Sequence, residues 1–294
     1  MNPRARVALF KSVGAVLEAL PERIDVALAQ RLGVELGVRS SSRQHLSDNL
    51  HRVLSGDAQP VETSLLARYV RRGFASYGQY WAEGAKLPAL SHETITSRFR
   101  IAEGLEHLEE AHARGQGVVI ALPHVGSWEW GGAFIASLGM PMTAIAEELS
   151  PPALFDWFKA KRESIGIHIE ALNAEASSKL LNVLKSGGVV GLLCDRDIAG
   201  GGVEVDFFSS RVTLPGGPAT LALRTGATLL AAACYAGPGR DHFAVVTPPI
   251  EALREGRLRE DVTRVTQAVA RELEDLIRRA PEQWHVLEER FGPA

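Results

Sequence analysis

A histidine and a glutamate with the types and spacing for acid–base chemistry lie in the segment VVIALPHVGSWEWGG, residues 118–132. Gly126 and Ser127 have the pattern of a helix start with Ser127 as the N-cap. Glu129 would then fall in the first turn, where the helix dipole favours an ionised carboxylate. His124, just before this helix, could hydrogen-bond Glu129 through one ring nitrogen and keep the other nitrogen as a base. A pair of this kind can deprotonate a hydroxyl group so that it attacks an acyl carbon.

The same residues also fit other arrangements. His124 could cap the helix beside a solvated Glu129. A serine nucleophile elbow needs the pattern G-x-S-x-G, and the segment around Ser127 lacks the first glycine in register, which favours a capping role for Ser127. Neither His124 nor His168 belongs to an H-E-x-x-H zinc motif, and the sequence has no Walker A loop and no G-x-G-x-x-G after a predicted strand. The commonest metalloprotease and nucleotide-binding motifs are therefore excluded.

Asp195, Arg196 and Asp197 form a second polar cluster at the end of the apolar run GVVGLLCD. An Asp-x-Asp pair can hold a divalent cation against a sugar-nucleotide diphosphate, as in many glycosyltransferases. The arginine between the two carboxylates instead suits a phosphate or an oxyanion. Glu204 and Asp206 follow at strand alternation and would share one face, so either could approach the site or lie on a solvated surface.

The spacing of apolar residues divides the chain into two parts. From residue 4 to about residue 80, apolar residues recur three and four positions apart, which predicts helices. After residue 95, short apolar runs bounded by Gly or Pro alternate with segments of helix length, and a last strand near DHFAVVTPPI precedes a long closing helix. The other predicted strands are residues 117–123, 140–147, 166–172, 188–195 and 228–236.

We therefore expect an α/β fold with a central, mixed but mostly parallel sheet flanked by helices. Residues 1–294 would form a single domain, with a helical part at 1–95 and an α/β catalytic part at 96–294. Open α/β sheets bind ligands outside the carboxyl ends of their strands. Both polar clusters follow such ends, one after the run at 117–123 and one after the run at 188–195, which predicts the functional site at that edge.

The composition limits the class of protein. Of 294 residues, 46% are hydrophobic and 23% charged, so the chain can bury a large core. A net charge of -3 excludes a generally basic nucleic-acid-binding protein, although the net basic first third leaves room for contact with an anionic membrane. No run reaches the roughly 18 to 20 uncharged apolar residues of a membrane span, so any membrane contact is expected at the surface. Cys194 and Cys234 lie in apolar runs and are expected to be buried, reduced thiols, typical of a cytosolic location.

Several segments, in chain order, resemble the bacterial lipid A biosynthesis acyltransferase family over nearly the whole chain. They are RQHLSDNLHRVLSG, LPHVGSWEWGG, KRESIGI, LCDRD with VEVDFFSSRVTLPGGPATLALRTGA, and PEQWHVLEERF. His124 and Glu129 match the two ends of the H-x4-(D/E) pattern of glycerolipid acyltransferases. Trp128 and Trp130, together with DRD and GVEVDFF, look most like the actinobacterial phosphatidylinositol mannoside acyltransferases of this family.

The resemblance implies a glycerolipid-acyltransferase-like fold and roles for individual residues. His124 would be the base, Glu129 its orienting partner and Glu204 a further catalytic carboxylate. Arg162 and Arg196 would hold phosphate or acyl oxygen, although the basic helical segment around Arg162 is by itself typical of a solvated or lipid-facing surface. Further substrate contacts are expected from Ser127, Trp128, Glu147 and Asp195.

The activity implied by the resemblance is transfer of a long fatty acyl chain from acyl-CoA to a mannose hydroxyl of phosphatidylinositol mannoside. The protein would be peripheral to the cytoplasmic face of the plasma membrane, without a metal or other cofactor and without a nucleic-acid partner. A lipid A-type acyltransferase with another glycolipid acceptor is one alternative. The others are a metal-dependent glycosyltransferase centred on Asp195 and Asp197, and a non-catalytic module that binds a membrane surface.

Overall fold

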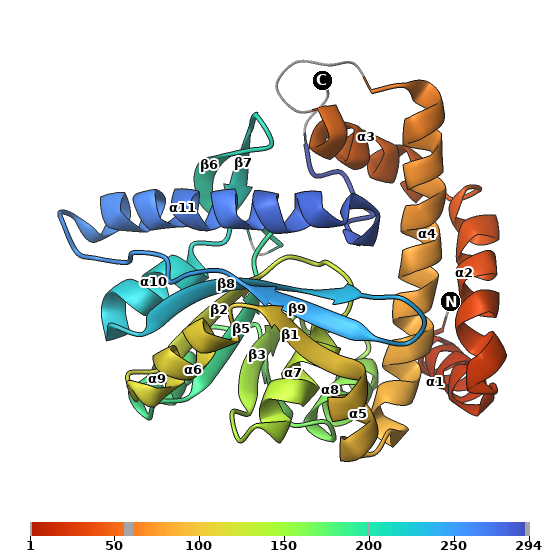
Figure 1. The fold of residues 1–294 in the computed structure, drawn as a ribbon, viewed down its shortest axis with the longest axis horizontal. Helices are drawn as coiled ribbons and strands as arrows, with labels where there is room; N and C mark the ends of the chain where they lie inside the picture. The colour runs from red at the N-terminus through yellow and green to blue at the C-terminus, as the bar shows by residue number, and fades with distance from the viewer. Residues whose placement is uncertain (1, 56–60, 199, 292–294) are drawn as a thin grey trace.

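The computed structural model describes residues 2–55, 61–198 and 200–291. In this part of the chain, seven strands form a central sheet in the order β1-β9-β8-β2-β5-β3-β4 (Figure 1). Strands β8, β2, β5, β3 and β4 pair in parallel, β9 is antiparallel to β8, and β1 is parallel to β9. The predicted mixed, mostly parallel sheet is confirmed. The strands are β1 (Phe99–Glu103), β2 (Val118–Leu122), β3 (Met142–Ala146), β4 (Ile167–Ala171), β5 (Val189–Leu193), β8 (Thr228–Ala236) and β9 (His242–Val246).

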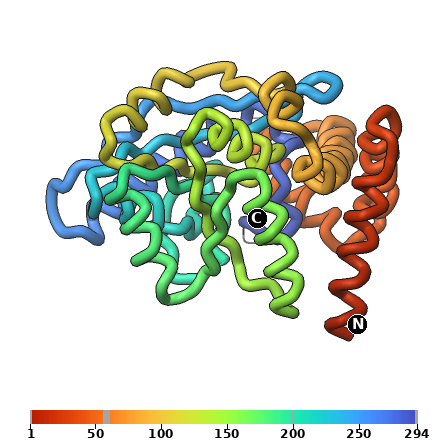
Figure 2. The backbone as a smooth tube through the Cα atoms, turned by 90° about the horizontal axis from the view of Figure 1, so that it is seen from below, coloured from red at the N-terminus to blue at the C-terminus, as the bar shows by residue number. Residues whose placement is uncertain are grey.

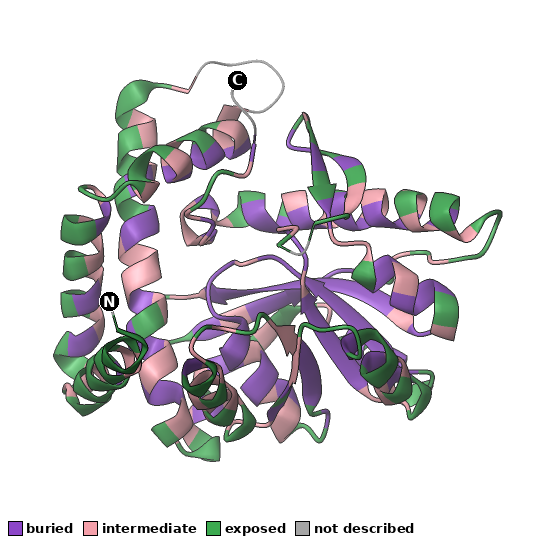
Figure 3. Ribbon diagram, turned by 180° about the vertical axis from the view of Figure 1, so that it is seen from behind, coloured by how far each residue is buried: buried purple, intermediate pink, exposed green. Residues whose placement is uncertain are grey.

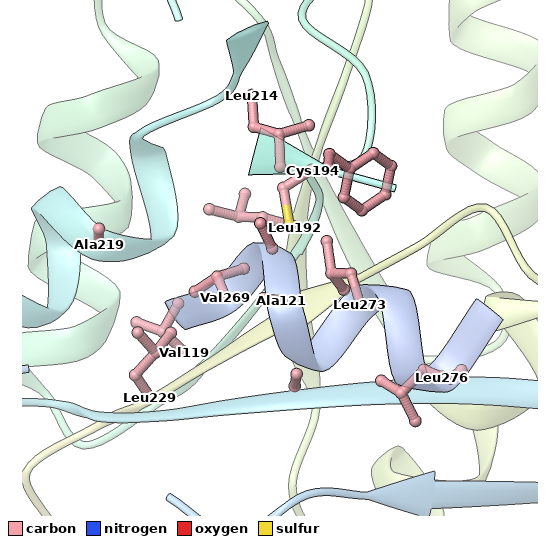
Figure 4. Packing of buried hydrophobic residues seen from close by; sticks show 14 of the residues in the cluster. Val119, Ala121, Leu192, Cys194, Leu214, Ala219, Leu229, Val269, Leu273 and Leu276 are labelled. Atoms are coloured by element: carbon pink, nitrogen blue, oxygen red, sulfur yellow. The ribbon is translucent and has the colours of Figure 1, made fainter. Parts of the chain in front are cut away.

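The central strands bury both faces, as their continuous apolar runs require. In β2, Val119 faces one hydrophobic core and its neighbour Ile120 faces the other. Figure 4 shows the first core, where strand residues meet α10 and α11. The helices of the first core are α9 (Ala176–Lys185), α10 (Gly217–Thr225) and α11 (Leu258–Arg279), and those of the second are α6 (Leu105–Ala113), α7 (Trp128–Ser137) and α8 (Pro152–Glu163).

The periodicity missed one strand, whereas the predicted strand alternation at Glu204 and Asp206 is confirmed by a hairpin outside the central sheet. The edge strand β1 was not predicted, because it is short and mostly solvent-exposed, so it lacks an apolar run. The hairpin of β6 (Val203–Phe207) and β7 (Ser210–Leu214) forms a separate antiparallel pair and packs beside α11. Both cysteines are buried free thiols, as expected.

The N-terminal part is helical, as predicted, and lies at one end of the sheet (Figure 1). Figure 2 shows α1 at the outer edge of the molecule, and Figure 3 shows how much of the outer surface of α1 and α2 is exposed. Among the described residues, no helix is both long and apolar enough to cross a membrane. The helices are α1 (Pro3–Ala19), α2 (Glu22–Gly37), α3 (Ser42–Ser55) and α4 (Thr63–Lys86), followed by η1 (Leu87–Ala89) and α5 (His92–Arg98).

Small residues allow α2 and α4 to pack with their backbones in contact. A Cβ on Gly33 would lie 2.4 Å from the Phe74 carbonyl oxygen, and one on Gly78 would lie 2.2 Å from the Ala29 carbonyl oxygen. Real Cβ atoms do not approach other atoms so closely, so glycine is required at both positions. The close contact fixes α4 against α2 along much of its length.

Buried charges attach α4 to the sheet. Asp25 of α2 is fully buried and forms an ion pair with Lys86 of α4 at 2.8 Å, and a second ion pair with Arg240 from the loop between β8 and β9. Glu83 of α4 and His242 of β9 form another buried pair at 3.0 Å. Because removing one partner of a buried pair is strongly destabilising, these contacts hold α4 in a defined position beside the sheet.

Candidate active site

The pairing of β2 with β5 brings His124 and Asp195 together. The two strands are parallel and in register, with Leu122 opposite Leu193, so the residues two positions beyond each strand lie side by side. The main-chain N–H of Cys194 donates to the Leu122 carbonyl oxygen at 3.0 Å and extends the ladder past the strand ends. The carboxyl edge of the sheet therefore presents an imidazole next to a carboxylate.

The Asp195 carboxylate holds His124 by two hydrogen bonds, and we call this pair the dyad. His124 Nδ1 lies 2.5 Å from Asp195 Oδ1, and the His124 main-chain N–H donates to Oδ2 at 2.8 Å. Asp195 is fully buried, whereas 22% of the His124 side chain is exposed. Because an ionised carboxylate only accepts hydrogen bonds, Nδ1 carries the proton of the neutral ring and Nε2 carries the lone pair. Nε2 is thus the atom that can act as a base.

Asp195 is ionised in spite of its burial. Burial by itself would raise its pKa, but the nearby His124 and the hydrogen bonds from His124 and Trp284 lower the pKa to about 2. Trp284 Nε1 donates to Asp195 Oδ2 at 2.7 Å, and the indole is buried. An ionised carboxylate in this position orients the imidazole and stabilises the imidazolium that forms when the ring takes a proton.

The C-terminal segment, residues 284–291, holds the main chain of the dyad. This segment follows η2 (Pro281–Gln283). The main-chain N–H of His285 donates to the His124 carbonyl oxygen at 2.7 Å. Arg290 Nε donates to the Asp195 carbonyl oxygen at 2.8 Å. The C-terminal segment therefore holds the chain beyond β2 and beyond β5, in addition to the contacts that these two segments make with each other.

Helices α3 and α4 support this C-terminal segment. Asn49 of α3 donates from Nδ2 to two carbonyl oxygens of the segment, at 3.0 and 2.9 Å. His285 Nε2 lies 2.9 Å from Ser76 Oγ of α4, and the centre of its ring lies 5.4 Å from that of Tyr80. Loss of solvent contact and the nearby His124 lower the pKa of His285 to about 3, so its ring is neutral.

Glu129 forms a second polar cluster with Tyr80 and Arg162, which we call the Glu129 cluster. The Tyr80 hydroxyl donates to Glu129 Oε1 at 3.0 Å, and Arg162 Nη2 donates to the same oxygen at 3.1 Å. Ser127 Oγ lies 3.5 Å from Oε2. The Arg162 guanidinium also lies over the Trp128 ring, 5.2 Å from its centre. Contacts from α4, α7 and α8 thus meet at one carboxylate.

Both hydrogen-bond donors of the Glu129 cluster, Arg162 and Tyr80, have raised pKa values and stay protonated. Burial opposes the charged form of Arg162, but the charge of Glu129 outweighs it and raises the pKa of Arg162. Burial, and after it the charge of Glu129, raises the pKa of Tyr80 above its usual value. Arg162 therefore stays cationic, and Tyr80 keeps the proton that it donates.

An apolar cavity of about 350 Å³ extends from the Glu129 cluster between α1, α4 and α8. Tyr80 lines the cavity and its ring lies against that of His285, whose main-chain N–H donates to His124, so His285 connects the polar end of the cavity to the dyad. A volume of this size is within the range of small-molecule sites. The other lining residues are Leu9, Phe10, Val13, Gly14, Leu17, Trp81, Gly84, Ala85, Leu87, Pro88, Trp157, Phe158, Lys161 and Ile165.

Residues 4–292 match the sequence model of the bacterial lipid A biosynthesis acyltransferases. The chain belongs to this family. It is 34% identical over 276 residues to the phosphatidylinositol mannoside acyltransferase of Mycobacterium tuberculosis, covering 92% of this chain and 84% of the relative. It is 32% identical to that of Mycolicibacterium smegmatis over 93% of this chain and 87% of the relative. Identity to the lipid A biosynthesis acyltransferase of Haemophilus influenzae is 27%, over 92% of this chain and 82% of the relative.

In this acyltransferase, the carboxylate bonded to His124 is not the predicted one. We expected Glu129 to orient the imidazole, and the structure corrects this expectation: Asp195 holds Nδ1, while Glu129 binds Tyr80 and Arg162. The physical reason is that α7 carries Glu129 toward α4 and α8, whereas the register of β2 and β5 puts Asp195 beside the ring. The H-x4-E spacing therefore marks two neighbouring clusters.

Three other predicted residues have defined positions. Ser127 is the N-cap residue of α7, as predicted, although its side chain makes no capping hydrogen bond. Arg196 forms a two-pronged ion pair with Glu288, at 2.5 and 2.7 Å, so a phosphate there would compete with a carboxylate. Glu147 directly follows β3 and is exposed at the same carboxyl edge as the dyad.

The structure does not bring Glu204 to the dyad, which corrects its predicted catalytic position. Glu204 lies on the outward face of the β6–β7 hairpin, where its side chain is 67% exposed and 3.2 Å from Arg211. The reason is strand alternation, because the inward positions of β6 are apolar core residues. Asp197 Oδ2 accepts a hydrogen bond from the Gly202 main-chain N–H at 2.8 Å, within its own loop.

Sequence reasoning missed Trp284, His285 and Tyr80 as site residues. Trp284 and His285 belong to the segment PEQWHVLEERF, which carried part of the family resemblance without a role for either side chain. Tyr80 has the spacing of a core aromatic, and only the fold shows its hydroxyl at Glu129. All three come from segments distant in sequence from the residues that they contact.

Trp284→Phe should lower acyl transfer and stability because it keeps an aromatic ring but removes the N–H that donates to Asp195. We expect a loss of about 1.5 to 3 kcal/mol in the free energy of unfolding, as for other hydrogen bonds to charged groups. Urea unfolding measures it, and an acyl-transfer assay measures the accompanying loss of rate. Trp130→Phe is the matched control, because among the described residues the buried Trp130 Nε1 has no hydrogen-bond partner. Equal losses in the two variants would contradict the role of Trp284.

Proposed function

We propose that this acyltransferase moves a long fatty acyl chain from acyl-CoA to a mannose hydroxyl of phosphatidylinositol mannoside. The observation that carries the proposal is a His124–Asp195 dyad that His285 connects to Tyr80 at the polar end of an apolar cavity. The dyad supplies a base for an alcohol, and the cavity supplies a site for a hydrocarbon chain. Membership of an acyltransferase family supports the combination.

In the proposed reaction, His124 Nε2 takes the proton of the acceptor hydroxyl as its oxygen attacks the thioester carbonyl carbon. The C–O bond forms, and the tetrahedral intermediate collapses with breakage of the C–S bond. The imidazolium then returns its proton to the departing CoA thiolate. The ionised, buried Asp195 stabilises the imidazolium between these two transfers, since opposite charges in a dry environment attract strongly. The products are an ester and free CoA.

The Glu129 cluster is proposed to position the thioester at the mouth of the cavity. Arg162 stays charged beside Glu129 and has limited freedom, because the carboxylate and the Trp128 ring both hold it. A fixed cation is suited to the carbonyl oxygen or a phosphate of acyl-CoA. In this proposal Glu129 is a positioning residue for Arg162, and no hydrogen bond from Glu129 to the base is needed.

The acyl chain is proposed to occupy the cavity with its thioester at the polar end. The walls come from apolar side chains of α1, α4 and α8. The three helices meet where the aromatic rings of Phe10, Trp81 and Phe158 contact one another. Burial of methylene groups there contributes roughly 0.8 kcal/mol each. An extended hydrocarbon is the ligand that such a lining fits.

The acceptor is proposed from the relatives named as phosphatidylinositol mannoside acyltransferases, which share 32 to 34% identity with this chain. The alternative is another glycolipid of the lipid A type, in line with the Haemophilus influenzae relative. A panel of mannosylated phosphatidylinositols and lipid A precursors separates the two, because only one class should accelerate CoA release from palmitoyl-CoA.

We propose that α1 and α2 contact the cytoplasmic surface of the plasma membrane. Apolar side chains are exposed along both helices, in a part of the chain that is net basic. Amphipathic helices of this kind bind anionic membranes through apolar burial and charge together. The exposed apolar residues are Leu9, Val13 and Val16 of α1 and Ile24, Leu28, Leu32 and Leu36 of α2.

A metal-dependent glycosyltransferase fits the geometry less well. Both oxygens of Asp195 accept N–H donors, from His124 and Trp284, and the Asp197 carboxylate holds its own loop. The two carboxylates are engaged separately and do not converge on one position for a cation. We propose that transfer requires no metal.

His124→Ala should lower kcat by about two to four orders of magnitude, the usual contribution of a general base. The measurement is CoA release from palmitoyl-CoA with a mannosylated phosphatidylinositol, with and without EDTA. His168→Ala, which removes an exposed histidine from β4, is the matched control and should leave kcat unchanged. Near-normal turnover by His124→Ala would overturn the mechanism, and loss of wild-type activity in EDTA would overturn metal independence.

Leu28→Glu combined with Leu32→Glu should weaken binding to vesicles that contain anionic phospholipid, because two carboxylates would replace apolar side chains on the proposed contact surface. Co-sedimentation with the vesicles measures the bound fraction. Leu138→Glu combined with Leu253→Glu adds the same charge at exposed leucines outside α1 and α2. If both double variants bind as the wild type does, the proposed membrane surface is wrong.

A further inference from the structure

Gly84 lies in the wall of the apolar cavity and leaves open space where a side chain would be. A Cβ on Gly84 would meet no atom of the described residues within 4 Å, although Gly84 lines the cavity. The other two glycines of α4 are packed. A Cβ on Gly73 would lie 3.0 Å from the Leu46 side chain, and one on Gly78 would lie 2.2 Å from a backbone oxygen of α2. Gly84 therefore differs from Gly73 and Gly78, because the space beside it is open and not filled by a neighbouring helix.

Helix formation does not explain glycine at this position. Glycine inside a helix costs about 0.5 to 1 kcal/mol relative to alanine, and Gly84 lies within the last turns of α4. Its φ is not in the left-handed region, and in the described part of the chain no other backbone segment approaches within 4 Å of a Cβ placed there. The feature that remains is the open volume inside the cavity.

The position of Gly84 along the cavity follows from helix geometry. Tyr80, at the polar end, is one turn before Gly84, about 6 Å along the helix axis, and Leu87 is a further 4 to 5 Å along. Lys86 Nζ donates to the Leu20 carbonyl oxygen, so the C-terminal ends of α1 and α4 lie together. The cavity wall at the level of Gly84 therefore lies between the Glu129 cluster and the end lined by Leu87.

We infer that Gly84 determines the length of the acyl chain that the enzyme accepts. The inference rests on the proposed function, in which the acyl chain enters the cavity from its polar end. The absence of a side chain at Gly84 lets a long chain pass this level and reach Leu17, Leu87 and Pro88. A branched side chain at the same position would fill the space one helical turn from Tyr80 and stop the chain there.

The test compares wild type, Gly84→Leu and Gly84→Ala across butanoyl-, hexanoyl-, octanoyl-, lauroyl- and palmitoyl-CoA, with kcat/KM for CoA release as the readout. Gly84→Leu should lower the ratio of kcat/KM for palmitoyl-CoA to that for butanoyl-CoA, whose short chain ends before the level of Gly84, by tenfold or more, since one methylene in a filled pocket changes discrimination by about 10 to 200-fold. Gly84→Ala, with one added carbon, should change the ratio less than Gly84→Leu. Ala67→Leu adds the same leucine to an exposed position of α4 and should leave the ratio unchanged.

The possible results separate this inference from the proposed function. An active Gly84→Leu variant with the wild-type ratio, or with an equal loss for every chain length, overturns the inference alone. Wild-type protein that releases no CoA from any member of the series overturns the proposed function and the inference with it. If circular dichroism shows that Gly84→Leu does not fold, Gly84→Met, an unbranched side chain that suits helices, is tested against the same expectation.

Discussion

The structure depends on an ionised carboxylate, that of Asp195, held with no solvent exposure at the end of β5. Isolation of such a charge from water costs several kcal/mol unless hydrogen bonds and a nearby positive group compensate it. The compensation comes from the main chain and ring of His124 and from the indole of Trp284. The same bonds that stabilise the buried charge also fix the imidazole with Nε2 as the free base.

This constraint extends into the N-terminal helices. The segment that carries Trp284 is held by Asn49 of α3 and by Ser76 of α4, and α4 in turn is attached to the sheet through its ion pairs. The same helix supplies Tyr80 to the Glu129 cluster and one wall of the cavity. Helix α4 therefore contacts the segment that supports the dyad, the Glu129 cluster and the apolar cavity, and connects all three.

The alternation of strands and helices could be predicted, because each apolar run is visible in the local sequence. The polar clusters at strand ends could be predicted as well, because parallel sheets in general bind ligands at the carboxyl ends of their strands. The sequence assigned the wrong partner to His124, because strand register is not visible before the strands are paired, and spacing favoured the nearby Glu129. The predicted position of Glu204 beside the dyad was wrong. Strand alternation shows that Glu204 and Asp206 share one face of β6, but it does not show which face of the strand is buried. The cavity could not be predicted, since its walls come from three separate helices, of which α1 and α8 are more than a hundred residues apart.

The most direct test of the central claim compares kcat for Asp195→Asn and Glu129→Gln in acyl transfer from palmitoyl-CoA. An asparagine that donates its amide N–H to Nδ1 would leave the ring proton on Nε2, so the base would be lost. We expect a fall of about three to four orders of magnitude for Asp195→Asn, similar to the loss when a triad aspartate is replaced in this way. We expect a smaller fall in kcat for Glu129→Gln, because the proposed role of Glu129 is to position Arg162. Near-normal turnover by Asp195→Asn together with an inactive Glu129→Gln would show that Glu129, and not Asp195, supports the base.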